Sequence, residues 1–251
     1  MGRAAALLDR TRVAAFVALA VVVGVYYATH ESWLRLSLWG SIAWLCFLVI
    51  PAVFGFVWLA LPAWAAPLRQ LLTATVVFAA AAVVLQATGA SPVANFAKLG
   101  AMTLGAWCFL RFFEELSWVV LVAVIVPFVD SYSVWRGPTN TIVNKHVQVF
   151  DALSFTFPVP GIDAGAKLGL PDLLFFALYL GAAARWRLRP GWTWLCLTAS
   201  IGGTIALTTV LDVNGLPALP LLSVGFLLPN ADLLWRAVRG RSARDPRRSP
   251  T

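Results

Sequence analysis

The sequence predicts an all-α protein, a polytopic transmembrane helical bundle of about eight spans. Hydrophobic residues make up 60% of the 251 residues and charged residues only 12%, which is about half the charged share of a water-soluble domain. The apolar residues also gather in blocks of roughly 20, the length that a helix needs to cross the hydrocarbon of a bilayer. We therefore expect most of the chain to lie in a lipid bilayer.

Charged residues, prolines and glycines separate eight apolar blocks, and each block predicts one helix. The predicted spans are 13–29, 38–62, 69–88, 93–111, 115–135, 170–187, 192–211 and 216–237. The second block is longer than one crossing requires, so we expect tilt or a kink at Pro51 to absorb the excess. No small-residue cleavage site follows the first block, so we expect an uncleaved span rather than a signal peptide.

Lysine and arginine are distributed unequally between the two sides of an eight-span bundle. Fourteen share a side with the termini: Arg3, Arg10, Arg12, Arg69, Arg111, Arg185, Arg187, Arg189, Arg236, Arg239, Arg241, Arg244, Arg247 and Arg248. Five lie on the other side: Arg35, Lys98, Arg136, Lys145 and Lys167. Because cytoplasmic loops are enriched in these residues, we predict a cell-membrane protein with both termini in the cytoplasm.

Two aspartates lie within blocks that are otherwise apolar enough to span a bilayer. Asp130 lies near the outer end of the fifth block and Asp172 near the outer start of the sixth. An ionised carboxylate in hydrocarbon costs about 3 kcal/mol on insertion scales, so such groups face the protein interior or a wet cavity. The run Pro217-Ala218-Leu219 begins the last block on the same side. A pair of carboxyl groups suits acid–base chemistry, so we expect the functional site here.

These three features resemble the motifs of the presenilin and signal peptide peptidase family of intramembrane aspartic proteases. That family has Tyr-Asp on one span, Gly-x-Gly-Asp on the next and Pro-Ala-Leu on the last. The corresponding stretches here are Val129-Asp130, Gly169-Leu170-Pro171-Asp172 and Pro217-Ala218-Leu219. Val129 stands where the family has Tyr, and Pro171 where it has Gly. The resemblance covers about the C-terminal half, from Glu114 onward.

The resemblance implies a presenilin-like fold and an aspartic-type intramembrane endopeptidase, with Asp130 and Asp172 as the catalytic pair. It also implies that six residues contact the substrate: Gly169, Leu170, Pro171, Pro217, Ala218 and Leu219. The predicted orientation matches that of signal peptide peptidases and is opposite to that of presenilin. The implied partners are therefore single transmembrane segments with cytoplasmic N-termini, such as signal-peptide remnants.

This interpretation divides the chain into three regions. Residues 1–112 form an N-terminal four-helix membrane half, residues 113–238 a catalytic membrane half, and residues 239–251 a basic cytoplasmic tail. Within the catalytic half, Pro171 indicates a helix start, and the positive end of a helix dipole favours an anion. We therefore expect Asp172 to be the more acidic carboxyl and Asp130 the proton donor in the resting state.

The long loop between the aspartates contains a stretch, Leu153–Pro160, whose residues alternate as in a β-strand. It is either a strand that pairs with an unwound substrate or a loop on the outer surface. Asp212 competes with the two aspartates by position, although a turn with Asn214-Gly215 is its expected role.

Two other functions stay open at this point. The departures at Val129 and Pro171 fit a catalytically inactive, presenilin-like membrane scaffold. A proton-coupled transporter also uses intramembrane acids, although the sequence shows no internal repeat.

The sequence gives no reason to expect a cofactor. Cys46, Cys108 and Cys196 all lie in apolar blocks and the two histidines lie outside the spans, so we predict no metal site. There is no nucleotide-binding loop. The net charge of +8 comes largely from the tail arginines, which favours a lipid-facing tail over nucleic-acid binding. The oligomeric state is not predicted.

Overall fold

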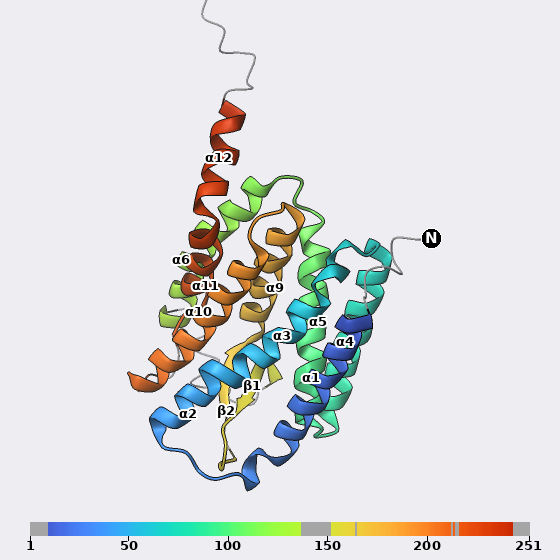
Figure 1. The fold of residues 1–251 in the computed structure, drawn as a ribbon, viewed down its shortest axis with the longest axis vertical. Coiled ribbons are helices and arrows are strands. Elements are labelled where there is room, and N and C mark those ends of the chain that lie inside the picture. Colours follow the sequence, from blue (N-terminus) through green and yellow to red (C-terminus); the bar gives the residue numbers. More distant parts are fainter. Residues whose placement is uncertain (1–9, 137–151, 164, 212, 214–215, 243–251) are drawn as a thin grey trace, which may run out of the picture.

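The structure is a computed structural model that describes residues 10–136, 152–163, 165–211, 213 and 216–242. Within these residues the fold is a bundle of helices with one two-stranded hairpin (Figure 1). The hairpin lies toward the end of the bundle opposite α12 (Figure 1). The predicted helical bundle is therefore confirmed, with the hairpin as an addition.

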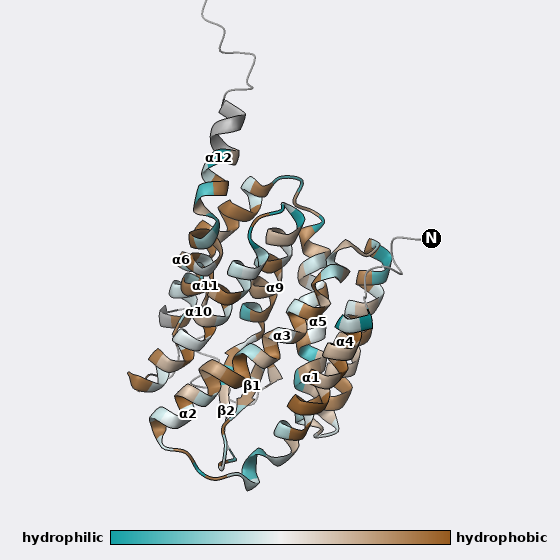
Figure 2. Cartoon of the chain, in the orientation of Figure 1, coloured by the Kyte–Doolittle hydropathy of each residue, from teal (hydrophilic) through white to brown (hydrophobic). Residues whose placement is uncertain are grey.

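Six helices in the described part are long and apolar enough to cross a membrane, by length and composition. They are α1 (Arg10–Thr29), α2–α3 (Leu38–Trp44 and Ile50–Ala60), α4 (Leu68–Ala87), α5 (Ser91–Leu110), α6 (Leu116–Arg136) and α10 (Pro190–Val210). Hydrophobic residues run along these helices and hydrophilic residues gather toward their ends (Figure 2). This pattern supports a membrane-embedded protein.

The other two predicted spans correspond to shorter helices. The sixth is α9 (Leu170–Arg185), and the eighth is α11 (Leu219–Leu227), a 3-10 turn (Leu228–Asn230) and α12 (Ala231–Ser242). The 16 residues of α9 and the 9 of α11 are fewer than the ~20 of a full crossing. The count of eight spans therefore stays a prediction, and α12 projects from the bundle (Figure 1).

The long second block is accommodated by a change of helix type before Pro51. A π-helical segment, Leu45–Val49, joins α2 to α3, and Pro51 lies in the first turn of α3. Proline lacks an N–H, and its ring clashes with the carbonyl four residues earlier in a regular α-helix. The wider i→i+5 pattern of a π-segment relieves that clash. The long second block is therefore irregular just before Pro51, where the π-helical segment lies.

Helix α9 packs against several other helices. It contacts α5, α10 and α11, and the Nε1–H of Trp107 in α5 donates to the carbonyl of Ala177 at 3.1 Å. A Cβ on Gly181 would lie 2.8 Å from the Trp107 ring, so only glycine permits this approach. On another face, the Tyr179 ring stacks on Phe226 of α11, with centroids 4.9 Å apart.

The hairpin consists of β1 (Ser154–Pro158) and β2 (Gly165–Gly169), which pair antiparallel. Two glycines of this segment permit close approaches. Gly161 has a φ of +74°, and a Cβ there would lie 2.6 Å from the Cα of Arg35. A Cβ on Gly165 would lie 2.4 Å from the Thr156 side chain. Strand β2 runs directly into α9, so the hairpin positions the start of that helix.

Strand β1 is buried inside the bundle. Phe155 and Phe157 are fully enclosed, and their rings contact those of Phe96 and Phe54, at centroid distances of 6.1 and 6.3 Å. The expected strand within Leu153–Pro160 is therefore confirmed as a conformation, over Ser154–Pro158. The alternative of a loop on the outer surface is wrong, because these aromatic side chains remove the segment from the surface.

Candidate active site

Asp130 lies in the second half of α6, three residues after Pro127, a proline inside the helix. Because Pro127 has no N–H, it leaves the carbonyl of Ala123 without its usual helical donor. The Asp130 side chain is half-buried, and its Oδ2 accepts a hydrogen bond from the backbone N–H of Leu219 at 3.1 Å. The first predicted aspartate thus contacts the Pro-Ala-Leu segment.

The contact with Leu219 has a local cause at the start of α11. Ala218 precedes the helix and has no side-chain oxygen that could cap it, and Pro220 has no N–H. The first N–H groups of a helix need an acceptor from outside the helix. Asp130, 89 residues earlier in the chain, supplies that acceptor, so it caps α11 from a neighbouring helix.

Asp172 lies in the first turn of α9, after Gly169 and Pro171. Its carboxyl group is hydrogen-bonded to the backbone of Gly169, and a Cβ at position 169 would lie 3.2 Å from Oδ2 of Asp172. Glycine at 169 therefore leaves room for the carboxylate to rest against the backbone.

The two carboxyl groups are near enough for a Coulombic interaction between them. This proximity follows from contacts of α6 with both α9 and α11. Two neighbouring carboxyl groups away from bulk water cannot both ionise at low cost, so such a pair shares one proton and titrates as a unit. The structure thus brings together Asp130, Asp172 and Leu219, which lie far apart in the sequence.

We expected Asp172 to be the more acidic carboxyl and Asp130 the proton donor, but the helix-dipole argument for this assignment no longer distinguishes the two. It assumed that only Asp172 faces a helix N-terminus, yet Asp130 accepts a bond from the first N–H of α11. The positive end of a helix dipole therefore favours both anions. Which carboxyl holds the shared proton stays a prediction.

The two departures from the family motifs have different local settings. Pro171 occupies the first turn of α9, where a backbone N–H has no partner within the helix, so the loss of that donor costs little. The side chain of Val129 is 61% exposed, so a Tyr hydroxyl in its place would not be enclosed with the carboxyl pair. Neither residue distorts the helix that carries it.

The other predicted contact residues lie on the segments that begin α9 and α11. The N–H of Leu170 donates to the carbonyl of Leu153 at 3.1 Å, so the hairpin holds the start of α9. Ala218 is buried and Pro217 half-buried beside the N-terminus of α11. The competitor Asp212 lies outside the described residues, as does the tail from residue 243.

Sequence reasoning missed three side chains near the site. Tyr26, Tyr27 and Lys98 all donate to the outer-edge carbonyls of β1. The prediction that β1 itself accepts a substrate strand therefore fails, because one edge pairs with β2 and the other contacts these side chains. The sequence did contain a signal for these contacts, because a lysine and two adjacent tyrosines stand within apolar blocks.

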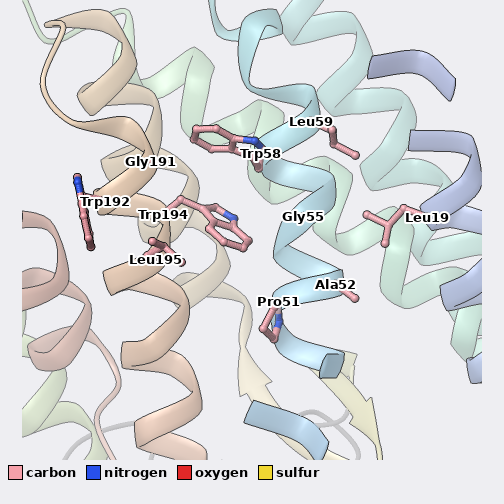
Figure 3. A pocket seen from close by; sticks show the side chains of 10 residues that line it. All are labelled: Leu19, Pro51, Ala52, Gly55, Trp58, Leu59, Gly191, Trp192, Trp194 and Leu195. Atoms are coloured by element: carbon pink, nitrogen blue, oxygen red, sulfur yellow. The ribbon is translucent and has the colours of Figure 1, made fainter. Parts of the chain in front are cut away.

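An apolar cavity of about 590 Å³ lies elsewhere, between α1, α3 and α10. Figure 3 shows Trp58 of α3 and Trp194 of α10 between these two helices. The Nε1–H of Trp194 donates to the carbonyl of Phe54. None of the lining residues is ionisable, so this cavity offers no acid–base chemistry.

The chain matches no protein-family model, no curated protein and no solved structure. The resemblance to presenilins and signal peptide peptidases therefore depends on the three motifs.

Proposed function

We propose that the protein is an intramembrane aspartic protease with a presenilin-like arrangement of about eight spans. It hydrolyses peptide bonds within single transmembrane segments. The observation that carries the proposal is that Asp130 accepts the N–H of Leu219 on a helix that packs against α9, where Asp172 lies near enough for a Coulombic interaction. Each group lies on its own helix and each faces a helix N-terminus.

The chemistry needs the pair to hold one proton. The ionised carboxylate takes a proton from water, and the water oxygen attacks the scissile carbonyl carbon. The protonated carboxyl donates its proton to the carbonyl oxygen, which gives a neutral tetrahedral intermediate. When that intermediate collapses, the C–N bond breaks, the departing nitrogen takes the proton of the protonated carboxyl, and a hydroxyl of the intermediate returns its proton to the other carboxylate. The pair thus returns to its singly protonated state.

The edge of β2 that faces away from β1 supports a route for the substrate. In the antiparallel register, Gly165, Lys167 and Gly169 pair with the β1 residues that bond away from β2. Their own backbone groups therefore point to the edge of β2 opposite β1. An extended peptide that paired there would run toward Asp172, three residues after the strand ends.

The proposal is tested with purified protein and a labelled single-span peptide. We expect the wild type to cleave it and Asp130→Ala and Asp172→Ala to lose at least roughly 10³-fold in rate, as for other catalytic side chains. Asp232→Ala is the matched control, since that carboxylate is exposed on α12 and pairs with Arg189. Equal cleavage by all variants would contradict the proposal. No cleavage by any would favour the inactive scaffold.

A further inference from the structure

Three side chains from the N-terminal half of the chain bind alternate carbonyls of β1. The Lys98 Nζ of α5 donates to Ser154 at 3.1 Å, and the hydroxyls of Tyr27 and Tyr26 in α1 donate to Thr156 at 3.0 Å and Pro158 at 2.7 Å. We call Tyr26, Tyr27 and Lys98 the edge clamp.

The strand register explains why these three carbonyls are within reach. In an antiparallel ladder, successive residues point their backbone groups alternately toward the partner strand and away from it. The carbonyl of Leu153 bonds to Leu170 on the β2 side, so the odd-numbered residues of β1 face β2. The even-numbered residues 154, 156 and 158 therefore face the outer edge, where the clamp lies.

The three side chains of the edge clamp are buried, so their polar groups need hydrogen-bond partners. Tyr26, Tyr27 and Lys98 are 8%, 6% and 5% exposed. A buried ammonium or hydroxyl is costly unless it is hydrogen-bonded, so these groups hold their acceptors in place. An apolar side chain in α5 would fill the space of Lys98 without that cost, so simple packing does not explain a lysine here.

We propose that Tyr26, Tyr27 and Lys98 are positioning residues for the aspartate pair, an inference that rests on the proposed function. They fix β1 from its outer edge, and β1 fixes β2 through the ladder. Strand β2 ends at Gly169, whose backbone contacts the Asp172 carboxyl. The clamp thereby sets where Asp172 meets Asp130.

The clamp occupies the outer edge of β1, so an added peptide strand would pair along β2. The register of the hairpin is set by Phe155 and Phe157, because a slip of β1 by one residue would turn these buried side chains out of the core.

The first test measures the hairpin directly, without any activity. Amide hydrogen exchange is followed over residues 152–170 in the double variant Tyr26→Phe/Tyr27→Phe, which loses only two hydroxyls, and in Lys98→Met and Lys98→Arg. We expect exchange to rise roughly tenfold in the double variant and several-fold in Lys98→Met. Lys98→Arg keeps a donor and stays near the wild type.

Trp194→Phe is the control, because it removes one N–H donor to a backbone carbonyl outside β1, that of Phe54 in α3, at 3.0 Å. Its hairpin exchange stays at the wild-type level. Unchanged exchange in the double variant and in Lys98→Met would overturn the clamp.

The second test measures cleavage of the labelled peptide by the same variants. We expect kcat to fall about tenfold in the double variant and in Lys98→Met, and to recover in Lys98→Arg, while Trp194→Phe keeps the wild-type kcat. Faster hairpin exchange with unchanged kcat would overturn the positioning role. If the wild type itself does not cleave, the proposed function fails, and the exchange measurement alone decides the clamp.

Discussion

The two helices that carry the aspartates differ in how the protein holds them. Helix α9 is buried almost without interruption from Phe176 to Ala183, and it contacts α5, α10 and α11. Among the described side chains of α6, only Val119 and Ala123 are buried, and its main partner is α11. Asp172 thus lies on a helix that packs against several neighbours, whereas Asp130 lies on a largely exposed helix that packs mainly against α11.

This difference indicates which contacts fix the geometry of the pair. Helix α9 and the hairpin provide the fixed position. Helix α6 reaches it through α11, where Asp130 caps the first N–H. Substitutions should therefore disturb stability through α9 and the pairing of the carboxyls through the α6–α11 contact.

The largest effect on stability is expected from Phe176→Ala. The Phe176 ring is fully buried and stacks on Phe54 at a centroid distance of 4.0 Å. Its removal leaves a cavity that should lower the free energy of unfolding by about 3 kcal/mol. Phe128→Ala on α6 is the matched control, because that ring is 74% exposed and should cost less than about 0.5 kcal/mol. Reversible unfolding in mixed micelles measures both, and equal losses would remove the contrast between the helices.

A smaller effect is expected from added volume at Gly181. A Cβ there meets the Trp107 ring at 2.8 Å, so Gly181→Ala should destabilise the protein by about 1–3 kcal/mol through overpacking. Gly203→Ala in α10 has no atom within 4 Å of the new Cβ and should be neutral or slightly stabilising. The same unfolding assay compares them. A neutral Gly181→Ala would show that α9 and α5 separate more easily than their contacts indicate.

The smallest effect separates capping from chemistry at Asp130. Asp130→Ala removes the acceptor for the Leu219 N–H and should cost about 0.5–2 kcal/mol, as for other helix caps. Asp130→Asn keeps a side-chain oxygen for that bond and should cost less, while cleavage is lost in both variants. Unfolding and cleavage are measured in parallel. Cleavage by Asp130→Asn at the wild-type rate would remove Asp130 from the proposed chemistry.

The helices themselves could be predicted because their cause is local. Apolar blocks of bilayer length, ended by charges, prolines and glycines, gave bounds within a few residues of those observed for α1, α4, α5 and α10. The irregularity at Pro51 followed from the missing N–H. The strand β1 was also visible in its alternation, but its partner β2 was not. Gly165–Gly169 is short and carries two glycines, which are depleted in strands.

The composition and order of residues by themselves determined that this chain forms apolar helices, with two carboxyl groups placed where burial makes them costly. The tertiary structure alone decided that Asp130 caps α11 and that Tyr26, Tyr27 and Lys98 bind the edge of β1. The physical reason is the range of the interactions. Helix formation depends on neighbours within a few residues, whereas these contacts join groups 56 to 132 residues apart, which only packing brings together.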